Sequence, residues 1–295
     1  MVCCLVILLN GYVVVQQFFQ MKSTTLSIVL LLAIGVAGNA QELYVYTDPA
    51  SNVPARSLTA KVSGKWLEGY HSKRTEWRFM PEVQVGLSKK WMLRANATFS
   101  DMYSSNVRWE SIRLYTKYRF LSQDDLHRHF RMAAFAEAAH SVNPVFYDEL
   151  NLDGDQSGLR GGLIATQLIN KLAVSVSGSY LYVTSERPKY FADAFPYQAL
   201  NYTASAGYLL FPGKYTSYRQ TNLNIYAELL GQKTLDKNRF YVDLAPAVQL
   251  IFNSNAKLNA GYRFQLNGNM HRMAKKQWLV SFEYVFLNAL GKKKK

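Results

Sequence analysis

Apolar and polar positions alternate along the chain in segments of about ten residues, the length that a strand needs to cross a membrane. The clearest of these segments covers residues 277–286. One face of it is wholly apolar and ends in aromatic residues: Trp278, Val280, Phe282, Tyr284 and Phe286. The opposite face includes Ser281 and Glu283. This period of two predicts a β-strand between an apolar and an aqueous environment.

The same alternation predicts twelve strands in the second part of the chain. They cover residues 57–66, 77–87, 91–100, 112–120, 130–139, 158–169, 172–183, 199–210, 222–232, 240–251, 258–267 and 277–286. Single-chain bacterial barrels have an even count, although ten or fourteen strands fit the pattern too. Asn170-Lys171 predicts a two-residue hairpin turn. We expect a longer turn over residues 121–129 and long loops over 142–157 and 184–198.

The length of the apolar runs decides how such a chain would cross a membrane. Between residues 41 and 295 no stretch reaches 18 uninterrupted apolar residues, which excludes a transmembrane helix there. Each unpaired backbone group is costly in hydrocarbon, so a sheet in a membrane must close on itself. The high share of aromatic residues, 14%, agrees with side chains that lie at a membrane interface. The predicted fold is therefore all-β, a closed antiparallel transmembrane β-barrel.

Two prolines conflict with regular strands at their positions. Pro81 and Pro246 fall inside predicted strands, where proline has no N–H to give to the hydrogen-bond ladder. A closed barrel has no free edge at which this loss would be harmless. We therefore expect each proline to occupy a bulge or a strand end.

The chain has 295 residues and a formal net charge of +14. Residues 21–40 have the pattern of a targeting sequence. An apolar run that ends at Ala37 is followed by small residues, which predicts a secretory signal peptide cleaved after Ala40. We interpret residues 1–20 as an upstream extension before the true start at Met21; the alternative is a long, atypical export or anchor segment. The remaining divisions are a periplasmic N-terminal segment (41–56), the barrel (57–287) and a basic C-terminal tail (288–295).

Charged residues on the inward faces are the main functional signal. By strand parity the inward cations are Lys61, Lys65, Arg78, Arg94, Arg113, Lys117, Arg119, Arg131 and Arg263. The inward acids are Glu82, Glu137, Glu228, Asp243 and Glu283. A polar pore with a basic bias lowers the barrier for anions. The alternative is a sealed interior of paired charges that only holds a small barrel together.

No catalytic or metal-binding constellation emerges from the sequence. His140 and Ser141 are adjacent, so they point to opposite faces of a strand and cannot make the contact that nucleophile activation needs. The pair Asp153 and Asp155 resembles a fragment of a calcium loop but lacks the downstream glutamate. Both cysteines, at positions 3 and 4, precede the mature chain. We predict no enzyme activity, cofactor, metal site or nucleic-acid binding.

Four stretches carry a resemblance to a known family. They are His127-Arg-His-Phe-Arg-Met-Ala-Ala-Phe135, Gly161-Gly-Leu-Ile-Ala-Thr-Gln-Leu168, Ala227-Glu-Leu-Leu-Gly-Gln-Lys233 and Gly261-Tyr-Arg-Phe-Gln-Leu-Asn-Gly-Asn-Met270. They resemble outer-membrane barrel proteins of Bacteroidetes that are described as transporter-like and are sometimes associated with heavy-metal efflux. The resemblance implies the fold and the bacterial outer membrane, and it transfers no site residue. In architecture and charge the chain is also similar to 12-stranded monomeric channels for acidic oligosaccharides.

The sequence therefore favours an outer-membrane channel. We expect a monomer that contacts outer-membrane lipid and lipopolysaccharide and passes small polar, anionic solutes. The competing hypothesis is a non-conducting barrel that serves as an accessory, scaffold or adhesion component, with its function in the loops 142–157 and 184–198.

Overall fold

The computed structural model describes residues 44–68, 74–104, 106–125, 128–185, 195–213 and 219–291. All of them belong to one compact unit. The predicted upstream extension and signal peptide lie outside the described residues, as does the end of the basic tail, 292–295. The described part contains no helix long and apolar enough to cross a membrane.

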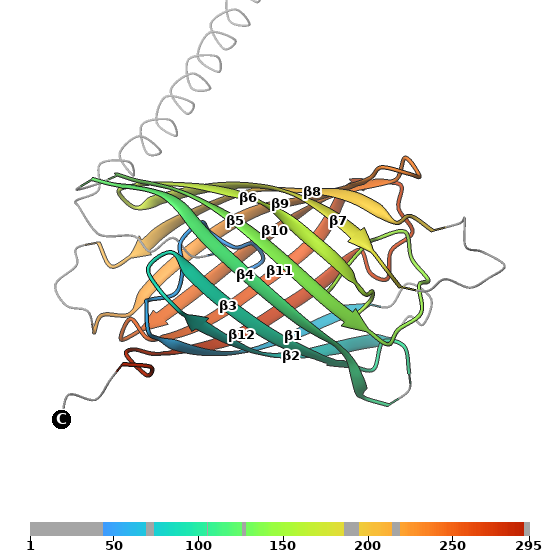
Figure 1. The fold of residues 1–295 in the computed structure, drawn as a ribbon, viewed down its shortest axis with the longest axis horizontal. Coiled ribbons are helices and arrows are strands. Elements are labelled where there is room, and N and C mark those ends of the chain that lie inside the picture. Colours follow the sequence, from blue (N-terminus) through green and yellow to red (C-terminus); the bar gives the residue numbers. More distant parts are fainter. Residues whose placement is uncertain are drawn as a thin grey trace, which may run out of the picture. The chain divides into compact units, whose positions relative to one another are not determined.

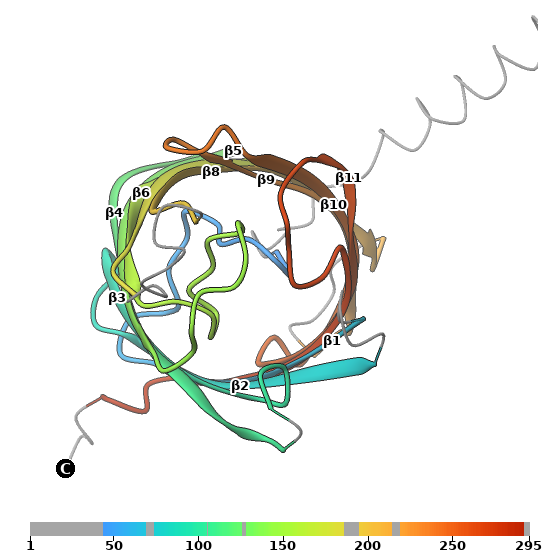
Figure 2. The ribbon, with the colours of Figure 1, turned by 90° about the vertical axis from the view of Figure 1, so that its right-hand side faces the viewer.

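Twelve antiparallel strands form one closed barrel (Figures 1 and 2). They are β1 (Leu58–Glu68), β2 (Thr75–Gly86), β3 (Trp91–Ser100), β4 (Arg108–Asp124), β5 (Arg128–Ser141), β6 (Gly158–Ile169), β7 (Leu172–Val183), β8 (Gln198–Phe211), β9 (Asn222–Thr234), β10 (Phe240–Phe252), β11 (Ala256–Gly268) and β12 (Lys276–Phe286). Each strand pairs with its neighbours in sequence, and β1 pairs with β12 to close the ring. The predicted fold class and the count of twelve are confirmed.

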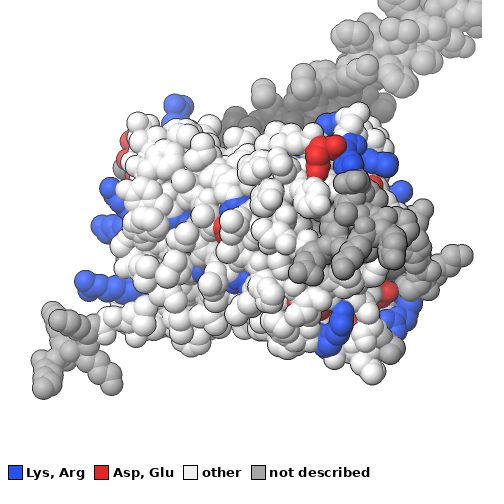
Figure 3. Space-filling model, turned by 45° about the vertical axis from the view of Figure 1, so that its right-hand side comes forward, with Lys and Arg blue, Asp and Glu red and all other residues white. Residues whose placement is uncertain are grey.

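The alternation in the sequence corresponds to the two surfaces of the barrel wall. Outward side chains are apolar and exposed; Leu114 and Trp278 each keep 59% of their surface accessible, and Phe282 keeps 50%. Inward neighbours such as Ser281 and Glu283 are buried. Figure 3 shows an outer face on which charged side chains gather mostly toward the two ends. A barrel wall that is apolar over its middle belongs in hydrocarbon.

Aromatic residues form rows near both ends of the outer wall. Trp66 of β1 pairs in register with Trp77 of β2 and with Trp278 of β12. Near the other end, the rings of Trp91 and Tyr118 lie 4.6 Å apart. Such belts mark the two membrane–water interfaces of a transmembrane barrel.

The two strand prolines are accommodated in a way that we did not expect. Each lies inside its strand, with no register shift at that point. The β2–β3 ladder has no pair for Met80 and Pro81, and the β10–β11 ladder has none for Ala245 and Pro246. Pairing with β1 and β9 continues through both prolines. Each residue of an antiparallel strand donates its N–H to one neighbour, so a proline needs a gap in one ladder rather than a bulge or a strand end.

The connections differ in length at the two ends of the barrel. The turn end carries the short connections β2–β3, β4–β5, β6–β7 and β10–β11, and the loop end carries the long connections β5–β6 and β7–β8 (Figure 1). The turn at Asn170-Lys171 is present as predicted, with Asn170 at φ 53°. The expected long turn over 121–129 is wrong, because β4 continues to Asp124 and β5 starts at Arg128.

Three segments fold into the ring instead of leaving it open. Figure 2 looks into the loop end and shows loop 142–157 and loop 269–275 bent over the lumen, with the N-terminal segment, residues 44–54, deeper inside. We expected the N-terminal segment to lie outside the barrel in the periplasm. The structure instead places residues 44–54 against inward-facing side chains of the wall, because those side chains supply the hydrogen-bond partners for its backbone.

Candidate functional site

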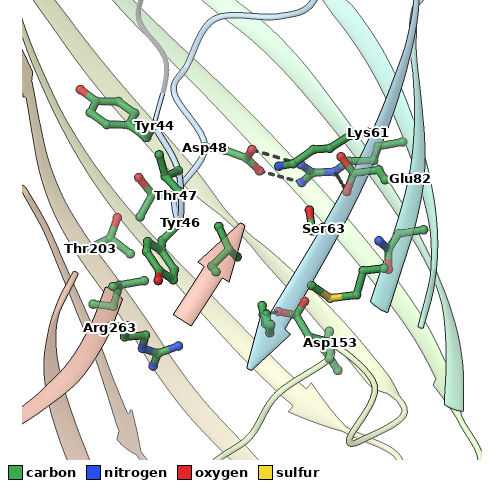
Figure 4. A pocket seen from close by; sticks show the side chains of 18 of the residues that line it. Tyr44, Tyr46, Thr47, Asp48, Lys61, Ser63, Glu82, Asp153, Thr203 and Arg263 are labelled. Carbon is green, nitrogen blue, oxygen red and sulfur yellow. Dashed lines mark hydrogen bonds and ion pairs between the residues drawn. The ribbon is translucent and has the colours of Figure 1, made fainter. Parts of the chain in front are cut away.

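A cavity of about 770 Å³ remains inside the barrel between these segments. Its lining combines the N-terminal segment, the tip of loop 142–157, part of loop 269–275 and the inner wall of most strands. Among the described residues the lining includes thirteen Lys and Arg against seven Asp and Glu. Figure 4 shows side chains from β1, the N-terminal segment and loop 142–157 converging on this space. The lumen is therefore polar with a basic excess.

One buried carboxylate anchors the start of the N-terminal segment. Glu228 of β9 has no exposed surface. Its two oxygens accept hydrogen bonds from the backbone N–H groups of Val45, Tyr46 and Thr47 at 2.8–3.0 Å and from the Thr47 hydroxyl at 2.7 Å. Hydrogen bonds to a charged group are stronger than those between neutral groups. One side chain of the barrel wall thus holds the start of the N-terminal segment.

Cations of the opposite wall hold the rest of the segment. Arg94 of β3 donates two hydrogen bonds to the Asp48 carboxylate, at 2.7 and 3.1 Å. The Lys117 ammonium donates to the carbonyls of Pro49 and Ser51 at 2.8 and 2.7 Å. The N-terminal segment therefore spans the lumen between β9 and the β3–β4 region.

Loop 142–157 places acidic side chains on cations of the same wall. Asp153 contacts Lys65 at 2.6 Å and also pairs with Arg113. Asp155 accepts a hydrogen bond from Arg78 at 2.6 Å, and Arg78 also lies 3.2 Å from the buried Glu110. Both aspartates of the stretch that resembles a calcium loop are therefore paired with basic side chains.

Loop 269–275 contributes a cation to the opposite side of the lumen. Arg272 pairs with Glu149 and Asp243, both at 2.8 Å. Its guanidinium also lies over the ring of Tyr241, 3.8 Å from the centroid, and Arg263 of β11 completes the cluster at 2.6 Å from Asp243. The two inward loops are therefore tied to one another and to the wall by charge.

Lys61 is unpaired among the described residues, unlike the lumen cations that hold the N-terminal segment and the loops. It projects from β1 into the cavity (Figure 4). Its register partners on β12 and β2 are Glu283 and Glu82. Within the described residues Lys61 makes no hydrogen bond or ion pair, whereas Glu283 is already paired with Lys257 at 2.6 Å. Lys61 is therefore a lumen cation that is available to a solute.

Most of the predicted inward charges line the cavity in the structure. These are Lys61, Lys65, Arg78, Glu82, Arg94, Arg113, Lys117, Arg131, Asp243, Arg263 and Glu283. Glu137 lies behind them, where it pairs with Arg113 and Arg160, and Glu228 lies under the N-terminal segment. Arg119 does not line the cavity. It donates to the carbonyl of Lys89 in the β2–β3 turn, beside an irregularity of the β4–β5 register.

Sequence reasoning missed the charges that lie outside clear alternation. Arg160 is on β6, whose pattern is weakened by glycines, and Lys257 precedes the part of β11 that alternates clearly. Asp48 lies on the N-terminal segment, and Asp153 and Arg272 lie on loops; strand parity does not apply to either. One signal was available: residues 142–157 carry four acids and no Lys or Arg, in a chain of net charge +14.

Comparisons with known proteins show what this fold is similar to. A scan against models of protein families returns no match, and neither does a search of curated proteins. Among solved structures, an outer-membrane channel from Pseudomonas putida F1 is similar with a TM-score of 0.53 and 13% identity, covering 82% of this chain and 100% of the channel. A porin named KdgM has a TM-score of 0.48 and 11% identity, covering 77% of this chain and 99% of the porin.

The similarity to the Pseudomonas channel shows a shared barrel fold. The barrel is closed and its outer wall is apolar between aromatic rows, so it spans a membrane with strands. This is the architecture of proteins in the bacterial outer membrane, and the chain is located there.

His140 is exposed and Ser141 is buried, as expected for adjacent residues of one strand.

The attachment of the loop tip gives a prediction for pH. Burial alone would raise the pKa of Asp153, but Arg113 and Lys65 outweigh it and hold that pKa well below the usual value. A carboxyl with a lowered pKa stabilises the attached loop fully above its usual pKa, and this stabilisation decreases as pH falls from the usual pKa through the lowered value. We expect the ion current to stay constant from neutral pH down to about pH 4, near the ordinary value for Asp, and to rise below it. In Asp153→Asn this acid-induced rise should be absent. A rise between pH 7 and 5 in the unmodified protein would contradict the prediction.

Proposed function

We propose that the protein is a monomeric outer-membrane channel that passes small polar, anionic solutes between its loop end and its turn end. The observation that carries the proposal is the lumen cavity of about 770 Å³ with its basic lining. Basic side chains along a water-filled path lower the barrier for anions. Lys61 supports this function, because it faces the cavity without an ion pair among the described residues.

Aromatic rings support one of the lumen cations from behind. Arg94 lies over the ring of Tyr115, 4.0 Å from its centroid, and this ring stacks on Phe135 at 5.5 Å. Neither ring lines the cavity, so the rings position the Arg94 guanidinium, which does line it. The likeness to the Pseudomonas channel is consistent with this proposal through its fold. A place in a Bacteroidetes family and a link to metal efflux stay predictions.

The second candidate is a non-conducting barrel with an accessory, scaffold or adhesion role. It is favoured by a specific observation, the presence of the N-terminal segment and two loops inside the lumen. Most of the lumen charges are paired there, as a sealed interior would require. The two candidates therefore differ in whether a continuous aqueous path crosses the barrel.

Ion conductance of the purified protein in planar bilayers separates these candidates. A channel should give discrete current steps with a reversal potential that favours anions in a salt gradient. Folding is checked beforehand by the heat-dependent electrophoretic mobility that closed barrels show. Folded protein that gives no current, both as the full mature chain and after deletion of residues 41–54, would reject the channel and favour the sealed barrel.

A further inference from the structure

The acidic loop 142–157 lies on the part of the lumen wall that is best suited to bind an anion. Its four acids are Asp148, Glu149, Asp153 and Asp155, and it has no Lys or Arg. The last three of these contact cations of the lumen: Lys65, Arg78, Arg113, Arg263 and Arg272. A segment of the protein thus occupies positions that the wall presents to negatively charged groups.

The strand residues of this wall are basic before the loop is considered. Lys65 and Arg78 are register partners on the neighbouring strands β1 and β2, and Arg113 comes from β4, with β3 between; all three line the cavity. The nearby wall acids, Glu110 and Glu137, contact Arg78 and Arg113. Asp153 and Asp155 bring two further carboxylates to these three cations. Without the loop tip, the cluster would carry an excess of positive charge.

The loop is attached by two different kinds of contact. Leu150 and Leu152 pack in a dry cluster with Leu181, Val183 and Ala199 of the β7–β8 wall. The tip, residues 153–155, crosses to the β1–β4 side and is held there by charge. An anion that enters the cavity can take the place of a carboxylate on these cations, whereas the apolar cluster has no charged group for which it could compete. The tip is therefore the part of the loop that another anion would displace.

Gly154 gives the tip the shape that brings both carboxylates to the wall. It has φ +118°, a conformation that residues with a side chain rarely adopt. A Cβ at this position would lie 2.8 Å from a Glu110 oxygen and 3.1 Å from the Arg78 guanidinium carbon. The backbone thus approaches the wall as closely as a ligand would. One residue, Gly154, separates Asp153 from Asp155, so their Cα atoms are at most about 7 Å apart along the chain.

We propose that the tip of loop 142–157 occupies, as an internal substitute, a binding site for a solute that bears two carboxylates a short distance apart. The site is the cluster Lys65, Arg78 and Arg113. Carboxylates of the solute replace Asp153 and Asp155 there, and the loop tip leaves the wall while the solute is bound. This inference rests on the proposed channel function and adds to it a solute class and a segment of the protein that competes with the solute.

Competition between the loop tip and the solute predicts opposite changes in solute affinity for two kinds of variant. Neutralising the loop acids removes the competitor, so the solute should bind more tightly. Neutralising the wall cations removes the site, so the solute should bind more weakly. A loop that only stabilises the barrel gives neither pattern. If the tip occupies the site for most of the time, its removal should tighten apparent binding by about tenfold or more.

The experiment measures block of the ion current by a capped Asp-Gly-Asp peptide, with capped Asn-Gly-Asn as the neutral probe of the same shape. The variants of the full mature chain are Asp153→Asn with Asp155→Asn, Lys65→Gln, and Arg113→Gln. Asp236→Asn is the matched control, because Asp236 is an exposed acid of the β9–β10 connection at the same end of the barrel. Asp153→Asn alone replaces the double variant if the latter does not form the barrel.

We expect the peptide to block the double variant at about one tenth of the concentration needed for the unmodified protein, and Lys65→Gln and Arg113→Gln to need more. Asp236→Asn should match the unmodified protein, and Asn-Gly-Asn should not block. Unchanged or weaker block in the double variant, or equal block by both peptides, would overturn the inference while the channel stands. Absence of current in every folded variant would instead reject the channel function itself.

Discussion

Glu228→Ala is expected to release the N-terminal segment and to raise the single-channel conductance several-fold. The carboxylate of Glu228 accepts four hydrogen bonds from residues 45–47, three of them from backbone N–H groups. A hydrogen bond to a charged group contributes about 1.5–3 kcal/mol, so the loss of several shifts the bound population by about two orders of magnitude or more. The N–H groups have water as their alternative partner once the segment leaves the lumen.

Two further variants make this prediction specific. Glu228→Gln keeps one acceptor oxygen and should give a smaller rise in conductance. Deletion of residues 41–54 sets the upper limit, because the barrel ladder starts at Leu58 and does not include them. If this deletion left the conductance unchanged, the segment would not obstruct the path, and the effect expected for Glu228→Ala would lose its basis.

Lys61→Glu should shift ion selectivity toward cations more than any other single charge reversal on the wall that leaves the inward segments attached. Lys61 faces the cavity and has no ion pair among the described residues, so its charge acts on a passing ion. At contact distance in water a unit charge is worth about 1 kcal/mol, which is about a fivefold change in the permeability ratio. Lys61→Gln should give about one such step, and Lys61→Glu about two.

Reversal potentials in a salt gradient measure this shift. Arg119→Glu is the matched control, because Arg119 carries the same charge but contacts the β2–β3 turn outside the cavity. Lys117→Glu would be a poorer probe, since Lys117 also holds the carbonyls of Pro49 and Ser51. Equal shifts in Lys61→Glu and Arg119→Glu would show that the path does not pass Lys61.

The barrel could be predicted from the sequence because each strand separates two media. The alternation around Trp278 and Glu283 predicts which side chain faces lipid and which faces the lumen, and the same parity placed Lys61 and Arg94 correctly in the cavity lining. The method failed where both faces of a strand meet water. β4 continues through Ser122 and Asp124 beyond the apolar belt, so its end carries no alternation and was predicted as a turn.

The contents of the lumen could not be predicted in the same way. Residues 44–54 have no periodicity that tells the inside of a barrel from the periplasm. Their position depends on partners far away in sequence, such as Glu228, and these come together only after the strands are in register. Charge was the one usable signal. Acidic connections in a chain with a basic inner wall are expected to fold toward that wall.

The pairing of β1 with β12 joins the first and last strands of the barrel, and residues 44–54 precede β1 directly. Assembly in the membrane therefore has a topological requirement. Either β1 and β12 pair around an N-terminal segment that is already enclosed, or the closed barrel takes up its N-terminal segment afterwards through one of its ends. In the first case a chain with a bulky fusion before Tyr44 would stall with an unsealed seam, and in the second it would mature into a cylinder with an empty bore.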